Sequence, residues 1–263
     1  MKNKRIILGI VVVLAIYAVI MIIMFYKKNS NINTDKYLIV NNNLNLKFNN
    51  GKYVKVGTSE IENSNIEFKA YVNNNYFGKY YLKYGGSWNL FDKSNNFIKY
   101  DGSLIAVSDG YELDFDNLNS RTINDDEKNY LTSKYGINNY DFLITNEVYD
   151  IDLDKNGTMD KIICISNSYY YSLSETYIEN YDIKNNYSLV LVILNGDEKV
   201  IHKEIGKNDI TVYSVIGSFR NDAKQINIIM ESTVGYISEN PTSIDEIYTY
   251  KNNTKKFDKI ISN

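Results

Sequence analysis

The sequence predicts a mainly β protein, with an N-terminal transmembrane helix followed by an antiparallel β ectodomain of one or two β domains and one short helix. Three observations lead to this prediction. A long uncharged apolar run opens the chain, many short runs of alternating or β-branched residues follow it, and only one later segment carries helical signals.

Residues 6–25 carry no charge and almost no polar group. A helix of that length covers about 30 Å, the thickness of a bilayer's hydrocarbon core, so these residues are expected to contact the membrane. The bulky residues 21–26 offer no small-residue cleavage site, which favours an uncleaved signal anchor over residues 6–26. Nearby cations are about equal on the two sides and do not orient the anchor. Because the basic tail at 1–5 is hard to translocate, we expect it in the cytoplasm and the bulk of the chain outside the cell membrane.

The charge and cysteine content narrow the function classes. Residues 29–263 hold 24 basic and 32 acidic residues, a net charge of −8, which predicts no binding to nucleic acid. The single cysteine, Cys164, excludes an intramolecular disulfide. Abundant Asn, Lys, Ile and Tyr with one Pro are typical of an AT-rich bacterial genome, which is the simplest explanation of the Asn runs.

The ectodomain reads as short strands separated by Asn- and Gly-containing turns, because both residues tolerate positive φ. The expected strands are 37–40, 44–48, 53–56, 66–72, 76–84, 88–91, 97–100, 104–107, 161–166, 188–194, 199–204, 210–219, 225–232, 246–251 and 256–261.

One helix is expected at 125–135. Asn124 or Asp125 can cap its first amides, acidic residues suit its positive end, and Gly136 ends it. The polar segment 117–124 before it is the expected domain boundary. The resulting division is a tail at 1–5, an anchor at 6–26, a spacer at 27–36, a β domain at 37–120 and a β domain at 121–263.

A cation site is predicted within residues 150–163, DIDLDKNGTMDKII. Asp152, Asp154, Asn156 and Asp160 occupy positions 1, 3, 5 and 9 of a loop that turns at Gly157. Alternate oxygen ligands around a glycine turn suit Ca²⁺. An EF-hand would place Glu at position 12 and helices on both sides, whereas this chain has an isoleucine there and strand-like flanks.

These residues resemble the calcium loop of FG-GAP or VCBS-type repeats, which lies between two strands of a β-propeller blade. The resemblance covers about fourteen residues and occurs once. It implies a structural Ca²⁺ bound by the side chains of Asp152, Asp154, Asn156 and Asp160 and by the backbone carbonyl of Thr158. The alternative is an Asx-rich turn without a metal.

A tyrosine-rich segment between 166 and 188 is the other candidate for recognition. A loop of that length is either functional or disordered, and tyrosine combines an apolar face with a polar tip. Tyr169, Tyr170 and Tyr171 are therefore candidate contacts with a cell-wall polymer or a protein partner. General tyrosine abundance is the other explanation.

The sequence offers little material for an enzyme. The sole histidine, His202, lies in an expected strand with no cysteine or second histidine to accompany it. Two interpretations fit the alternating acidic residues Glu112, Asp114 and Asp116. They form the solvated face of a strand, or two of them form the carboxylate pair of a glycosidase. We therefore expect a surface binding protein. The alternatives are an envelope carbohydrate-active enzyme and an accessory subunit of a membrane complex.

Overall fold

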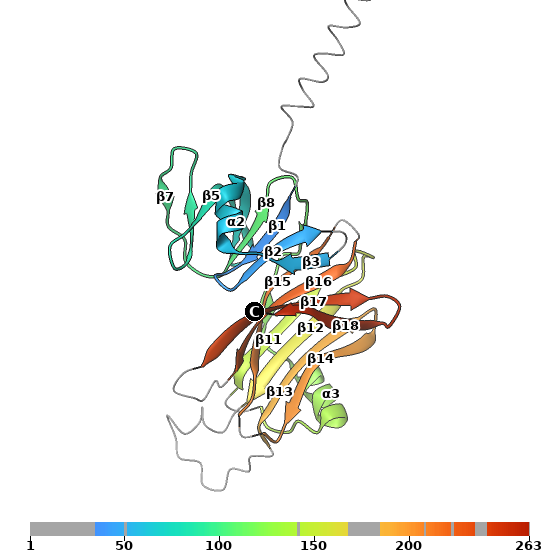
Figure 1. The fold of residues 1–263 in the computed structure, drawn as a ribbon. Coiled ribbons are helices and arrows are strands. Elements are labelled where there is room, and N and C mark those ends of the chain that lie inside the picture. Colours follow the sequence, from blue (N-terminus) through green and yellow to red (C-terminus); the bar gives the residue numbers. More distant parts are fainter. Residues whose placement is uncertain are drawn as a thin grey trace, which may run out of the picture. The chain divides into compact units, whose positions relative to one another are not determined.

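The computed structural model describes residues 35–49, 52–140, 143–167, 185–207, 209–221, 224–234 and 241–262 (Figure 1). These residues form three sheets, and every strand pair within them is antiparallel, which confirms a mainly β fold. Among the described residues, no helix is both long enough and apolar enough to cross a membrane. The expected tail and anchor, most of the spacer, and Tyr169, Tyr170 and Tyr171 lie outside the described residues.

The first sheet is built from residues 36–108, in the order β3-β2-β1-β8-β4-β5-β6-β7. A short helix, α2 (Thr58–Ser64), lies against one face of this sheet through Ile61. The strands are β1 (Lys36–Val40), β2 (Leu44–Asn49), β3 (Lys52–Lys55), β4 (Phe68–Val72), β5 (Asn75–Tyr84), β6 (Trp88–Phe91), β7 (Phe97–Ile98) and β8 (Leu104–Ser108).

The second sheet has the order β10-β11-β12-β13-β14 and is covered on one face by α3 (Asp125–Tyr135). Its strands are β10 (Ser120–Arg121), β11 (Leu143–Ile151), β12 (Asp160–Asn167), β13 (Tyr187–Leu194) and β14 (Asp197–Ile205). The third sheet has the order β18-β17-β16-β15-β9. It contains β9 (Asp114–Phe115), β15 (Val212–Arg220), β16 (Ile226–Val234), β17 (Thr242–Lys251) and β18 (Lys256–Ser262).

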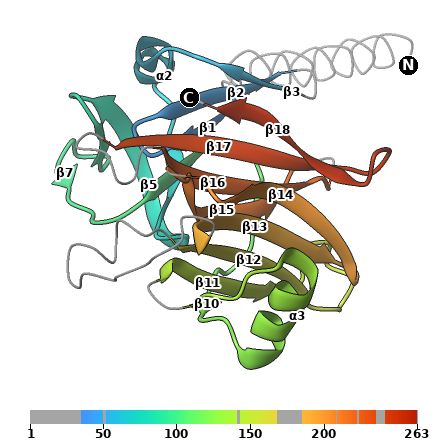
Figure 2. The same ribbon diagram turned by 90° about the horizontal axis from the view of Figure 1, so that it is seen from below.

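The third sheet is the middle layer of the stack (Figures 1 and 2). Successive side chains of a strand point to opposite faces, so neighbouring residues enter different cores. Ile229 packs with Leu38 and Ile105 of the first sheet, whereas Ile228 packs with Val192 of the second. Because both faces of this sheet are covered, β15 and β16 are buried along most of their length, including polar residues such as Ser218 and Asn227.

The expected helix at 125–135 is confirmed as α3, and Asn124 is its N-cap. The Asn124 side chain accepts from the Glu127 amide while the Glu127 carboxylate accepts from the Asn124 amide, forming a capping box. The expectation of a single helix after the apolar N-terminal run is wrong, because α2 also forms. No side chain caps α2, and Ile61 is its one buried residue, so it lacks the capping and periodic signals that identify a helix.

The two expected β regions, 37–120 and 121–263, meet inside one compact unit that spans Lys36–Asn263. Strand β9 belongs to the first region by sequence, yet it pairs with β15 of the second, with Phe115 opposite Phe219. The segment at 117–124 follows β9 of the middle sheet, contains β10 of the second sheet and ends at the start of α3.

Candidate metal centre

The candidate cation loop connects β11 and β12, where Ile151 pairs with Asp160 and closes a hairpin. The intervening residues reverse the chain with help from two positive φ angles, 59° at Lys155 and 89° at Gly157. Glycine adopts such a conformation without steric cost, which explains its place at this position. The strand pairing therefore holds both ends of the loop together.

Three of the predicted ligands converge in this loop. One carboxylate oxygen from each of Asp152, Asp154 and Asp160 lies within 4.8 Å of the others. Oxygens that share a Ca²⁺ ion at 2.3–2.6 Å lie at most about 5 Å apart. The donor chemistry and the spacing of these side chains therefore fit a hard divalent cation.

The loop also satisfies many of its polar groups internally. Asp152 accepts from the amides of Asn156 and Gly157 at 3.0 and 2.8 Å. Asn156 Oδ1 accepts from the Thr158 amide at 2.7 Å, which places Thr158 in the same turn. These bonds form in the loop itself, so both a cation site and an Asx-rich turn are compatible with them.

Asp160 is the buried member of the cluster, at 3% exposure. Burial raises the pKa of its carboxyl, and the charges of Asp154 and Asp152 act in the same direction. Backbone amides of Asn195 and Leu153 oppose this by donating to Asp160 at 2.8 and 2.9 Å. A divalent cation at this position would reduce the repulsion among the three carboxylates.

Asn195 is a site residue that sequence reasoning missed. It lies in the β13–β14 turn, where Asn195 and Gly196 have φ of 53° and 78°; in the sequence, an Asn-Gly pair signals a hairpin turn and no ligand. Its Nδ2 donates to Asp154 at 2.7 Å, and its side chain also contacts Asn156. The amide can rotate to present its oxygen instead, which would add a neutral ligand from a second hairpin.

A buried ion network connects the loop to the middle sheet. Arg220 of β15 donates to the Leu153 carbonyl at 2.6 Å and to Asp116 at 3.0 Å. Lys155, which belongs to the loop, forms an ion pair with the same Asp116 carboxylate at 2.9 Å. Ser218 donates a further hydrogen bond to Asp116. Leu153 and Lys155, at positions 2 and 4 of the loop, thus both contact this network.

The carboxylates considered for catalysis are all engaged by cations. Lys69 contacts Glu112 at 2.7 Å, and one Arg220 nitrogen contacts both Asp114 and Asp116, at 2.8 and 3.0 Å. The guanidinium group therefore occupies the space between the two aspartates, where a glycosidase would hold its substrate.

His202 lies in β14 with its ring against Tyr213, at a centroid distance of 4.6 Å. Burial lowers the pKa of His202, although the nearby Glu204 carboxylate at 3.4 Å acts in the opposite direction. Burial between two sheets thus favours the neutral form of the imidazole.

No family model, no curated protein and no solved structure matches this chain. The resemblance to the FG-GAP or VCBS-type calcium loop therefore stays a prediction from the residues at 150–163.

Proposed function

We propose that this chain is a membrane-anchored, extracytoplasmic binding protein in which a structural Ca²⁺ stiffens the loop at 152–159 and the first residue of β12. The single observation that carries the metal proposal is the convergence of the Asp152, Asp154 and Asp160 carboxylates. Asn156 and the Thr158 carbonyl would complete an all-oxygen shell, which is the ligand type that Ca²⁺ prefers.

The proposed role of the ion is mechanical. It would join the β11–β12 hairpin to the β13–β14 turn through Asp160, which already accepts from the Asn195 amide. It would also join the hairpin to the middle sheet through Arg220. Binding to the folded state alone stabilises that state by about 1.4 kcal/mol when free Ca²⁺ is tenfold above Kd. Extracellular calcium modules have Kd values of about 10⁻⁴–10⁻³ M, which suits a site outside the cell.

The proposed anchor is the uncharged run at 6–25, whose length matches a bilayer core. The net charge of −8 over residues 29–263 argues for a partner other than nucleic acid, such as a cell-wall polymer or another protein. Protease treatment of intact cells tests the topology. Digestion of the chain beyond residue 30 is expected, and full protection would contradict it.

The metal proposal is tested with the Asp152→Ala, Asp154→Ala double variant. The melting temperature of the wild type is expected to rise in Ca²⁺ relative to EDTA, and that rise is expected to disappear in the double variant. Asp101→Ala with Asp126→Ala removes two exposed carboxylates elsewhere and serves as the matched control. A wild type that melts at the same temperature in Ca²⁺ and EDTA would refute the site.

A further inference from the structure

A second site is suggested by a cavity of about 240 Å³ between the first sheet and the middle sheet. Strands β2 and β3 contribute Phe48, Lys52 and Tyr53, while the opposite wall comes from β16, β17, β18 and the turn before β16. At about 30 Å³ per water molecule, the volume corresponds to roughly eight waters. It is therefore suited to one sugar-sized group and too small for most drug-sized ligands.

One wall of the cavity is aromatic. Phe48 and Tyr53 are directly opposed in the β2–β3 pairing, and their ring centroids lie 5.2 Å apart. Tyr111 stacks on Phe48 at 5.6 Å and lies within hydrogen-bonding distance of Tyr53 at 3.1 Å, which fixes both rings. A preformed aromatic wall suits the flat C–H face of a sugar ring.

The facing wall is polar and buried. Asn227 is fully buried, and its Oδ1 accepts from the Thr249 hydroxyl at 2.6 Å, so the orientation of its amide is fixed. Its Nδ2 donates to the Gln225 carbonyl at 2.8 Å. Gln225 Oε1 accepts from Asn221 at 3.0 Å, while Gln225 Nε2 has no acceptor among the described residues. Asn227 and Thr249 thus fix the wall from within, and Gln225 Nε2 is the amide donor that it offers to a hydroxyl group of a ligand.

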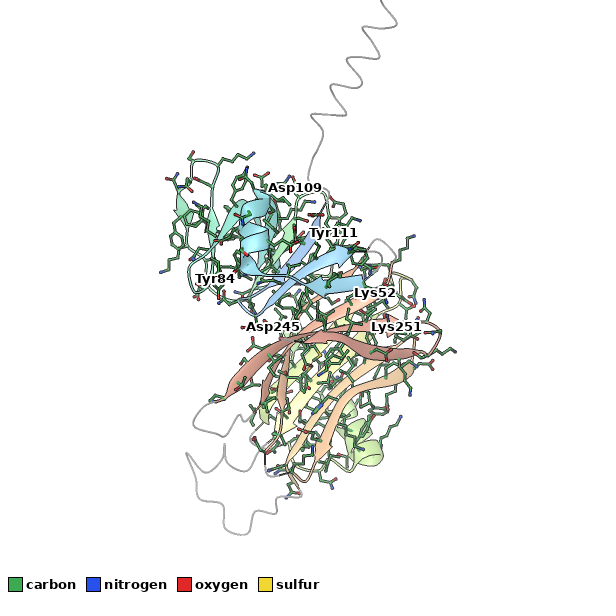
Figure 3. All side chains as sticks on the ribbon, viewed as in Figure 1. Lys52, Tyr84, Asp109, Tyr111, Asp245 and Lys251 are labelled. Atoms are coloured by element: carbon green, nitrogen blue, oxygen red, sulfur yellow. The ribbon has the colours of Figure 1, made fainter. Side chains whose placement is uncertain are left out.

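Two lysines border the cavity, Lys52 on β3 and Lys251 on β17 (Figure 3). Neither forms an ion pair within the described part of the chain, and no described carboxylate lines the cavity. Lys256 stands directly opposite Lys251 in the β17–β18 register, and like charges in that position repel. Asp258 stands opposite Thr249, yet no ion pair joins it to these lysines. In an acidic chain, this local excess of positive charge favours an anionic ligand.

We infer that this cavity binds one acidic sugar unit, a monosaccharide that carries a carboxylate or a phosphate. The sugar ring lies on Phe48 and Tyr53, the Gln225 amide binds one of its hydroxyl groups, and the lysines Lys52 and Lys251 bind its anionic group. This inference gives a ligand class to the proposed binding function, but it does not rest on the calcium loop.

Titration of the detergent-solubilised full chain with glucuronic acid and glucose 6-phosphate tests the inference. Glucose and inorganic phosphate are the matched probes for the ring alone and the anion alone. At least one acidic sugar is expected to bind tenfold or more tightly than either matched probe. Lys52→Gln with Lys251→Gln is expected to weaken this binding at least tenfold. Lys93→Gln with Lys99→Gln removes two charges elsewhere and is expected to leave it unchanged.

Competition by a purified polymer that carries the same acidic sugar distinguishes the two sources of the ligand. Stronger competition per sugar unit by the polymer assigns the site to an envelope polymer, and equal competition assigns it to the free sugar. Binding is expected to persist in EDTA and in the Asp152→Ala, Asp154→Ala variant, so failure of the calcium site leaves this result unaffected. The inference is overturned if neither acidic sugar binds, if phosphate alone binds equally well, or if the Lys52 and Lys251 variant binds normally.

Discussion

Replacement of Asp245 by Asn is expected to stabilise the fold at neutral pH. Asp245 lies on β17 with 0% exposure, between the middle sheet and the first sheet (Figure 3). Asn41 donates to its Oδ1 at 3.1 Å and the Asn43 side chain also acts on the carboxylate, whereas Oδ2 is buried without a hydrogen bond of standard geometry in the described structure. Glu231 stands opposite in the β16–β17 register and adds a like charge. The ionised carboxylate is therefore poorly compensated.

The size of the effect follows from the pKa of Asp245. Burial is the main cause that raises this pKa from 3.8 to about 6; the charge of Glu231 acts in the same direction, and hydrogen bonds from Asn41 and Asn43 oppose it. Because the folded-state pKa is the higher one, the fold favours the protonated acid. The free energy of unfolding therefore decreases as pH rises from about 4 to about 6, by about 3 kcal/mol in total, and stays level above that range. Asparagine keeps the shape without the charge.

Urea denaturation followed by the fluorescence of Trp88, the sole tryptophan and 1% exposed, measures the difference. The free energy of unfolding of Asp245→Asn is expected to be higher than that of the wild type by up to about 3 kcal/mol at pH 8. Near pH 4 the two proteins are expected to be equally stable. Asp101→Asn changes an exposed carboxylate and is expected to show no such pH-dependent gain. An Asp245→Asn protein that is no more stable than the wild type at pH 8 would refute the reasoning.

Three further substitutions test other parts of the structure by urea denaturation. Burial acts to raise the pKa of Glu127, but hydrogen bonds from Arg121 and Lys161 lower it to about 2, so Glu127→Gln should cost about 1–3 kcal/mol at pH 7. The loss of stability in this variant should shrink as pH falls from about 4.5 towards 2. A loss that does not depend on pH would contradict the lowered pKa of Glu127. Arg220→Met leaves the buried Asp116 carboxylate without its main partner, so it should lower the free energy of unfolding by about 3 kcal/mol or more. It should also weaken Ca²⁺ binding. A loss of stability below about 1 kcal/mol would argue against the network. Gly217→Ala places a methyl group 2.8 Å from Ile105 Cδ1 between two sheets and should cost about 1–3 kcal/mol, whereas an unchanged midpoint would show that the interface is loosely packed.

Local patterns predicted much of the secondary structure. The expected helix has the observed bounds, and most expected strands lie within a few residues of the observed ones, because caps, turn residues and side-chain alternation act over short distances. The short helix α2 was missed because one buried isoleucine gives no periodicity. Strands β9 and β10, with two residues each, were missed because so short a run carries no alternation, and the nine-residue β11 was expected only at its end, as a strand-like flank of the cation loop.

The candidate metal centre was predictable only in part. The spacing of aspartates around Gly157 indicated the loop and three residues that the structure brings together. Asn195 in the β13–β14 turn and Arg220 on β15 contact the loop from positions far along the chain, so no local pattern signals them. The order of the sheets likewise depends on pairings such as β1 with β8, which join residues about seventy positions apart.

A direct count of bound calcium tests the central claim. The full chain is equilibrated with millimolar Ca²⁺, dialysed against a lower fixed concentration and measured for calcium and protein together. One ion per chain is expected for the wild type, and none is expected for Asp152→Ala with Asp154→Ala. Calcium-free wild-type protein, or equal calcium in both proteins, would contradict a metal centre formed by these aspartates.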